Sequence, residues 1–150
     1  MESNDDLFES VPDVEFAFPG PLRDLLVGAI LAGEKTSTTT LFEEYGLEGE
    51  PLPCLGDRGR VLDSDGHPVA LIEVVGVDLV RLGDVNLEHA IAEGEGYTTV
   101  AEWRRGHEAF WHSDDYRAYR DDPHFTVNDD SLAVLERFEI VSSAPESQPE

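Results

Sequence analysis

One apolar stretch, PVALIEVVGV at residues 68–77, constrains the fold of this chain more than any other segment. Its β-branched residues favour a strand, and it is far shorter than the roughly 18 apolar residues that a membrane-spanning helix needs. The sequence DSDG at residues 63–66 precedes it and is typical of the turn in a β-hairpin. We therefore predict a hairpin over residues 59–82 whose second arm is mostly buried.

The segments around this hairpin alternate between helical and extended patterns. Apolar residues recur with helical spacing from residue 22 to residue 30, and Thr99 with Glu102 has the spacing of a capping box. In chain order we expect a short strand within 14–18, a helix from Pro21 that ends at Gly33, an extended segment at 34–40, a short helix at 41–45, helices at 87–92 and 100–111, an acidic, turn-rich segment at 113–130, and a strand at 131–141. This order favours a small α+β domain with a mixed or antiparallel sheet curled into a barrel, and it disfavours a doubly wound sheet.

The charge balance excludes one large class of function. Asp and Glu total 33 while Lys and Arg total 10, so the formal net charge is −23. A surface this negative repels phosphate backbones, and we expect no non-specific DNA or RNA binding of the basic-patch kind. The charge fits a high-salt cytoplasm, where it is screened, or acidic termini and loops, and the sequence leaves both explanations open.

Other features argue against export, a membrane role and a metal. The acidic start of the chain lacks the basic and apolar segments of a signal peptide, so we expect a cytoplasmic protein. The single cysteine, Cys54, excludes an internal disulfide and a cysteine-based zinc site. The five histidines show neither i, i+4 pairing with one another nor an HExxH pattern, and we predict no metal and no cofactor.

The basic residues carry a sharper signal. Of the ten Lys and Arg residues only Lys35 is a lysine, and it lies in the threonine-rich segment GEKTSTTT. The chain uses arginine at every other basic position, so residue 35 is the one side chain that combines a positive charge with the ability to titrate and act as a nucleophile.

The surrounding stretch LAGEKTSTTTLFEEY resembles the signature of the ASCH family, the ASC-1 homology domains related to PUA domains. That signature is a Gly-x-Lys-x-x-Thr core after the first helix, represented here by Gly33, Lys35 and Thr38. The hairpin, the segment EHAIAEGEGYTTVAEWRRGHEAFW and the closing strand LERFEIV follow in the family's order. The resemblance covers about residues 14–141, so we expect one ASCH or PUA-like domain at 13–141 between disordered ends at 1–12 and 142–150.

The resemblance implies a small β-barrel of five or six mostly antiparallel strands flanked by helices, with a cleft between the lysine segment and a helical insertion. Family members look RNA-related: one bacterial branch removes the acetyl group from acetylcytidine, and another member is described as a metal-dependent ribonuclease. The amidohydrolase's lysine and threonine match Lys35 and Thr38, and its glutamate aligns best with Glu93, with Glu95 as the alternative. Thr40 stands where many members carry arginine, so a phosphate or nucleobase contact at that position does not carry over.

The same residues suit amide hydrolysis on chemical grounds, because that reaction needs a nucleophile, a proton shuttle and oxyanion stabilisation. Thr38 is the candidate nucleophile, a neutral Lys35 the candidate base, and Glu93 the group that orients the lysine or a water. Nearby carboxylates favour a charged Lys35, which would bind an anion or stabilise an oxyanion instead. Lys35 and Thr38 converge only in a turn or a helix, since residues three apart on a strand face opposite sides. The structural alternative is a surface salt bridge at Lys35 and an ordinary strand threonine at 38.

The remaining candidates are contacts to a ligand in the cleft, namely Gly33, Thr40, Tyr45, Glu95, Trp103 and His107. Trp103 and His107 recur on one face of the helix expected at 100–111. A nucleobase would stack on the indole if this face borders the cleft, and Tyr45 would do the same from the other side. The alternative is that both residues belong to the core, as we expect for Phe110 and Trp111.

We therefore expect an ASCH-domain protein that binds a nucleoside-sized or RNA-derived ligand around Lys35. A second interpretation is a small hydrolase that uses Lys35, Thr38 and Glu93 on an acylated nucleoside, the acidic charge disfavouring a ribonuclease. A third is an acidic protein that mimics nucleic acid, which would leave the lysine segment without a purpose. The expected partner is a small nucleoside-like ligand or RNA, and the oligomeric state stays open.

Overall fold

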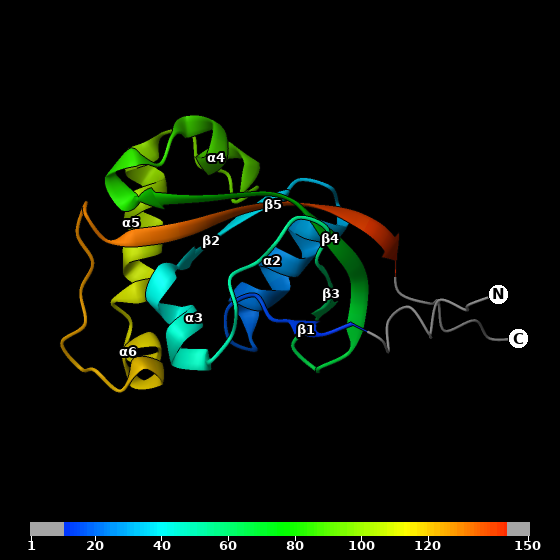
Figure 1. Ribbon diagram of the computed structural model, residues 1–150, viewed down its shortest axis with the longest axis horizontal. Coiled ribbons are helices and arrows are strands. Elements are labelled where there is room, and N and C mark those ends of the chain that lie inside the picture. The colour runs from blue at the N-terminus through cyan, green and yellow to red at the C-terminus, as the bar shows by residue number, and fades with distance from the viewer. Residues whose placement is uncertain (1–10, 144–150) are drawn as a thin grey trace, which may run out of the picture.

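The computed structural model describes residues 11–143, which form one five-stranded sheet with helices packed around it (Figure 1). The sheet order is β1-β3-β4-β5-β2, and the strands cover β1 Asp13–Val14, β2 Ser37–Leu41, β3 Arg58–Leu62, β4 Pro68–Arg81 and β5 Leu132–Ser143. Only β1 and β3 run parallel, so the predicted α+β class and mostly antiparallel sheet are confirmed. Of the two ends predicted to be disordered, 1–12 and 142–150, residues 142 and 143 belong instead to β5, and residues 1–10 and 144–150 lie outside the described residues.

The predicted hairpin is the centre of this sheet. Strands β3 and β4 pair antiparallel through a turn in which the Asp63 backbone N–H donates to the His67 carbonyl over 2.9 Å, and Gly66 has a positive φ of 82°. Strand β4 continues past the hairpin and pairs along nearly its whole length with β5, which in turn carries β2. The hairpin and β5 therefore form the middle of the sheet and connect its β1 edge to its β2 edge.

The expected closed barrel is not what the structure shows. β1 and β2 are the two edges of the sheet, and no ladder joins them within residues 11–143. β1 has only two residues, Asp13 and Val14, which is too short to carry the ladder across to β2. The sheet is therefore open.

The helices are α2 Pro21–Leu31, α3 Phe42–Glu48, α4 Leu87–Ala92, α5 Val100–Trp111 and α6 Asp114–Arg120, with a 3₁₀ turn, η1, at Leu82–Asp84. Helix α5 begins with the predicted capping box between Thr99 and Glu102. Helix α6 was not expected, because it lies in the acidic segment predicted to be turns. The Ser113 hydroxyl accepts a hydrogen bond from the Tyr116 backbone N–H and caps this helix, and Tyr116 is buried. No helix in the described part of the chain is long and apolar enough to cross a membrane.

The buried apolar residues form two clusters. One packs α2 against β3 and β4 and contains Phe16, Leu26, Val27, Ile30, Val61, Ala70, Ile72 and Phe138. The other contains Leu41, Leu82, Val85, Ala90, Trp103, Trp111, Tyr116, Val127 and Ala133. Figure 1 shows α4, α5 and α6, which supply several members of the second cluster, gathered at one end of the sheet. The residues described next contact members of both clusters.

Candidate functional site

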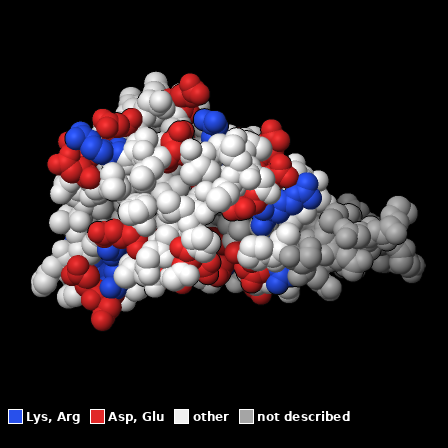
Figure 2. Space-filling model, viewed as in Figure 1, with Lys and Arg blue, Asp and Glu red and all other residues white. Residues whose placement is uncertain are grey.

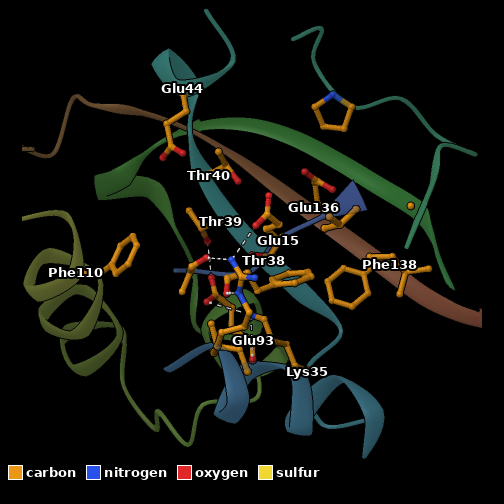
Figure 3. Close-up of a pocket in the computed structure, with 18 of the residues that line it drawn as sticks. Glu15, Lys35, Thr38, Thr39, Thr40, Glu44, Glu93, Phe110, Glu136 and Phe138 are labelled. Carbon is orange, nitrogen blue, oxygen red and sulfur yellow. Dashed lines mark hydrogen bonds and ion pairs between the residues drawn. The ribbon is translucent and has the colours of Figure 1, made fainter. Parts of the chain in front are cut away.

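A pocket of about 830 Å³ collects most of the residues that the sequence singles out. Its lining includes Lys35, Thr38, Thr40, Tyr45, Glu93, Glu95 and His107. Figure 3 shows Lys35 and Glu93 close together at one side of this pocket, and Glu44 and Glu136 at the other. We call the first group, with Glu95 and His107, the lysine end, and the second, with Tyr45 and Tyr116, the tyrosine end.

Lys35 reaches the pocket because the chain reverses sharply after α2. Gly33 adopts a φ of 79°, which a side chain would strain, and the Glu34 and Lys35 backbone N–H groups both donate to the Ala29 carbonyl. The Thr36 backbone N–H then donates to the Ala92 carbonyl over 2.8 Å and ties this segment to the end of α4. The Lys35 side chain is thereby buried, with only 2% of its surface exposed.

Glu93 and Glu95 reach the same place through a second sharp turn. Gly94 lies between them with a φ of 70°, and a Cβ atom at this position would collide with the Glu34 carbonyl. The turn of the lysine segment and the turn of the glutamate segment are therefore in direct backbone contact. Both carboxylates lie near the Lys35 ammonium, and which of the two acts in catalysis stays a prediction.

The Lys35 ammonium has four oxygen partners. It donates to the Ser37 carbonyl over 2.8 Å and to the Glu93 backbone carbonyl over 3.4 Å. Its Nζ also lies 3.7 Å from Glu93 Oε1 and 3.8 Å from Glu95 Oε2. Since Lys35 and Glu93 are almost completely buried, this is a buried charge cluster at a pocket wall, and the surface salt bridge that was the structural alternative is wrong.

Glu93 is held as a carboxylate by donors on three other elements. Its Oε1 lies 2.9 Å from His107 Nε2 of α5, and its Oε2 lies 3.1 Å from His89 Nε2 of α4 and accepts from the Thr39 hydroxyl of β2. Burial alone would raise the pKa of Glu93, but the hydrogen bonds from both histidines and the charges of His107 and Lys35 hold that pKa well below its usual range.

His107 donates one of the hydrogen bonds that Glu93 accepts. Its Nδ1 lies 2.9 Å from the Trp103 carbonyl, which can only accept, so Nδ1 bears a hydrogen. Its Nε2 faces the Glu93 carboxylate and donates as well, which makes the ring an imidazolium. Burial lowers the pKa of His107, but the Glu93 hydrogen bond and the charges of Glu93 and Glu95 outweigh it and raise that pKa. The His107 ring also stacks on Trp103, with 4.3 Å between ring centroids.

Glu95 is partly buried, with 16% of its side chain open to solvent, compared with 1% for Glu93. Burial and a hydrogen bond with Glu93 raise the pKa of Glu95 to about 7, although the Lys35 charge opposes them. Two carboxyl groups in contact with opposite protonation preferences are typical of acid–base sites.

The structure removes two predicted ligand contacts from the pocket. Trp103 is 0% exposed, so a nucleobase cannot stack on its indole; helix α5 turns this residue into the core and leaves His107 at the pocket. Gly33 shapes the turn before Lys35 and is absent from the pocket lining. Phe110, which we assigned to the core, lines the pocket and is only partly buried.

Thr38 and Thr40 line the pocket from strand β2, and the role of Thr38 as a nucleophile stays a prediction. Thr39 and His89, which the sequence reasoning missed, supply the contacts to Glu93. The available signal was that His89 precedes Glu93 by four residues, the spacing that places two helical side chains on one face. Thr39 had no such signal, because its contact spans 54 positions of sequence.

The tyrosine end pairs carboxylates with phenols. The Tyr45 hydroxyl donates to Glu136 Oε1 over 3.1 Å, and the Tyr116 hydroxyl donates to Glu44 Oε2 over 2.7 Å. Burial raises the pKa of Glu44 and of Glu136, and the tyrosine hydrogen bonds offset this only in part.

Within residues 11–143, two groups of side chains have a spacing that a metal ion could use. In Glu93, Glu95 and His107 the ligand atoms lie within 4.8 Å of one another, but this group already faces the Lys35 ammonium, which supplies the positive charge there. The second group is Asp63, Asp65 and His67, where one Asp63 oxygen accepts from two backbone N–H groups of the hairpin turn.

Comparison with known proteins supports the fold independently of this geometry. A family model described as the ASCH domain matches residues 15–142. The crystal structure of a protein from Enterococcus faecalis is 28% identical, with a TM-score of 0.75 over 88% of this chain and 77% of that chain. The crystal structure of an ASCH domain from Lactobacillus crispatus is 26% identical, with a TM-score of 0.73 over 95% of this chain and 96% of that chain. No curated protein matches the chain.

Proposed function

The chain belongs to the ASCH domain family, and we propose that it binds a nucleoside-sized ligand in the pocket around Lys35. The observation that carries this proposal is the buried Lys35 ammonium at the wall of an 830 Å³ pocket, between two carboxylates of which one is open to that pocket. Pockets of roughly 300–1,000 Å³ with a few polar groups on an apolar lining are the usual binding sites of small molecules. Replacing a buried charge cluster by apolar residues is often neutral or stabilising even when the charges are well paired, and clusters of this kind are common at functional sites.

Charge favours a small ligand without phosphate groups over an RNA strand. The acidic residues at the pocket are Asp13, Glu15, Glu44, Glu48, Glu50, Asp57, Glu93, Glu95 and Glu136, and the basic residues are Arg23, Lys35 and Arg58. Figure 2 shows acidic side chains spread over the visible face, with basic groups in fewer places. A polyanion would be repelled from such a pocket, whereas a nucleoside carries no charge that the carboxylates oppose.

Aromatic residues other than Trp103 supply stacking surfaces. Phe18 and Phe110 pack at 5.7 Å between centroids, Tyr97 lies 6.1 Å from the His107 ring, and all four residues line the pocket. A base that stacks on an aromatic ring gains about 1–3 kcal/mol. The stacking role predicted for Trp103 therefore passes to these side chains.

A second candidate function is hydrolysis of an acylated nucleoside. The specific observation is that Glu95, with a pKa of about 7, lies beside the ionised Glu93 and the Lys35 ammonium. A group with a pKa near the working pH is suited to general acid–base catalysis, and a fixed ammonium is suited to stabilising an oxyanion. Ribonuclease activity is disfavoured by the acidic lining.

Calorimetric binding of cytidine, acetylcytidine and a panel of acylated nucleosides tests the first function. We expect saturable binding to the wild-type chain and its loss in Lys35→Met, which keeps the bulk of the side chain and removes the charge. Arg105→Met removes an exposed cation outside the pocket and should bind normally. Thermal unfolding of each variant shows that it is folded. A folded wild-type chain that binds none of these nucleosides contradicts the proposal, and binding to basic proteins that persists in Lys35→Met would support nucleic-acid mimicry.

A further inference from the structure

The two glutamates of the lysine end have different access to a ligand. Both oxygens of Glu93 are occupied, Oε1 by His107 and Lys35 and Oε2 by His89 and Thr39. The residue is only 1% exposed. Because the Thr39 hydroxyl has one hydrogen and donates it to Glu93, its oxygen accepts from His89 Nε2 at 2.7 Å, which closes this network. No oxygen of Glu93 is therefore free to exchange a proton with a ligand.

Glu95 has the opposite character. It lines the pocket and keeps 16% of its side chain exposed, with Oε2 at 3.8 Å from Lys35 Nζ. One carboxylate oxygen of Glu95 lies within 4.8 Å of a Glu93 oxygen and of a His107 ring nitrogen, and burial together with the neighbouring Glu93 raises the pKa of Glu95. Since Glu93 is held ionised from three sides, Glu95 is the carboxyl group of this pair that takes up a proton more readily.

The charged groups that face Glu95 come from every neighbouring element. Lys35 follows α2, Glu93 follows α4 and His107 lies on α5, and all three act on Glu95 electrostatically. Tyr97, on the segment between Glu95 and α5, feels the Glu95 charge in turn. The two cations favour the ionised form of Glu95, while Glu93 and burial favour the protonated form. Burial and Glu93 outweigh the two cations, so the pKa of Glu95 rises to about 7 and the group can change its protonation state at neutral pH.

We propose that Glu95 is the residue that exchanges a proton with the molecule bound at Lys35, and that Glu93 is a positioning residue that fixes Lys35 and His107. This inference rests on the proposed hydrolytic function, and it assigns the acid–base role to a residue other than the glutamate that the family resemblance favours. Glu95 would touch the attacking water and the leaving group, whereas Glu93 acts only through its neighbours.

The transfer balances as an ordinary hydrolysis. The ionised Glu95 takes a proton from water, the water oxygen forms a bond to the acyl carbon, and the C=O electron pair moves onto the carbonyl oxygen beside the Lys35 ammonium. When the C=O bond re-forms, the C–N bond breaks, and Glu95 gives its proton to the departing nitrogen. One water is consumed, one carboxylic acid and one amine are formed, and Glu95 returns to its starting state.

The decisive experiment follows the glutamate carboxyl carbons by ¹³C NMR in the full chain from pH 5 to pH 9, with and without saturating cytidine. We expect one lysine-end carboxyl to titrate near pH 7, to shift its midpoint when cytidine binds, and to be missing from Glu95→Gln. Glu139→Gln, an exposed change on β5 outside the pocket, should leave that titration intact. The proposal is overturned if Glu95 titrates near pH 4.5, or if its titration midpoint is the same with and without bound cytidine.

Turnover of acetylcytidine separates this inference from the function on which it rests. If the wild-type chain hydrolyses the probe, Glu95→Gln should lower kcat by about 10²-fold or more with little change in KM, and the limb of the pH–rate profile near pH 7 should disappear. Unchanged kcat in Glu95→Gln would overturn the role of Glu95. If the wild-type chain binds cytidine but hydrolyses none of the acylated nucleosides, the hydrolytic function fails, and the NMR titration still decides whether Glu95 exchanges a proton on binding.

Discussion

At the lysine end of the pocket a carboxylate faces cations, and at the tyrosine end carboxylates face phenol hydroxyls. Glu93 is the more deeply buried, yet its pKa lies well below the usual range, because His107, His89 and Lys35 surround it. Glu44 and Glu136 are less buried, yet their pKa values are raised although each accepts a tyrosine hydrogen bond. The difference teaches that one tyrosine hydrogen bond does not offset burial here, even at Glu44, where the charge of Arg120 also acts. Only the combination of two histidine hydrogen bonds with the charges of His107 and Lys35 at Glu93 outweighs it.

This contrast suggests different roles in catalysis and in ligand recognition for the two ends of the pocket. The lysine end holds fixed charges of both signs in a nearly dry place, which is the arrangement that stabilises a charge as it develops in a reaction. The tyrosine end holds carboxyl groups with raised pKa values and phenols that can both donate and accept, which is suited to recognising the polar edge of a neutral molecule. Four predictions test this division, beginning with the largest expected effect.

Removing the charge of Glu93 should have the greatest cost. Glu93→Gln leaves Lys35 and His107 as buried cations without their carboxylate, and loss of one partner from a buried pair typically costs about 3–5 kcal/mol. Glu136→Gln at the tyrosine end should cost less than about 1 kcal/mol, because the Tyr45 hydroxyl can donate to an amide oxygen as well. Denaturant unfolding at pH 7 measures both, and similar losses at the two positions would remove the basis of the comparison.

A Cβ atom should be far less tolerable at Gly94 than at Gly49, although both have a φ near 70°. Gly94→Ala adds a collision with the Glu34 carbonyl to the strain of a left-handed backbone, and we expect it to lower the free energy of unfolding by about 3 kcal/mol. Gly49→Ala, at the end of α3, meets no atom within 4 Å and should cost about 1 kcal/mol. Urea unfolding of the pair isolates the backbone contact that joins the two turns.

The stability of the wild-type chain should fall as pH rises from 5 to 8. The folded-state pKa of Glu95, about 7, lies above the ordinary value of 4.5, so the folded chain holds a proton that the unfolded chain has released. The contribution of Glu95 is full below pH 4.5 and is lost as pH rises through 7, and the raised pKa of His107 acts in the same direction. In Glu95→Gln the decline should be smaller by about 2 kcal/mol.

Melting temperatures of the wild-type chain and of Glu95→Gln at each pH provide this measurement. Glu139→Gln is the matched control and should keep the wild-type slope, because its side chain lies outside the pocket. Parallel curves for the wild-type chain and Glu95→Gln would mean that Glu95 has an ordinary pKa and that the lysine end lacks the proton we assign to it.

The smallest effect is expected at the tyrosine end. Tyr116→Phe removes the hydroxyl that donates to Glu44 and should cost about 1 kcal/mol, the usual net contribution of one hydrogen bond. It should also raise the pKa of Glu44 further, since that hydrogen bond lowers it. Chemical unfolding and a carboxyl NMR titration measure the two effects, and a loss as large as that of Glu93→Gln would contradict the predicted difference between the two ends.

Local patterns predicted the elements whose signals lie within a few residues. The DSDG turn with its two arms, the helical spacing of α2 and the Thr99–Glu102 capping box all appear in the structure, because each depends on neighbours in sequence. Helix α6 was missed because what stabilises it is distant: Tyr116 is buried among core residues and hydrogen-bonded to Glu44, 72 positions away. Barrel closure was wrongly predicted because it depends on the length of β1, which is only two residues long and which no local pattern specified.

The candidate site shows the same distinction between signals in the sequence and contacts between distant segments. Lys35 was found because it is the one lysine in an arginine-using chain, and Glu93 and Glu95 because the family resemblance aligned them with a catalytic glutamate. Thr39 was missed because its contacts require β2 to lie beside α4, which no short pattern encodes. His89 was missed although its spacing of four residues from Glu93 was a usable signal. Trp103 was misplaced because helical spacing identifies a shared face but not which part of that face meets the core and which the pocket.

Lys35 is the sole lysine of the sequence, and the fold hides it. Amine-directed chemistry, whether a crosslinking reagent or an enzyme that acylates or ubiquitinates lysine side chains, therefore finds no accessible ε-amine on the native domain. The rate at which Lys35 is labelled would therefore measure how often the pocket opens.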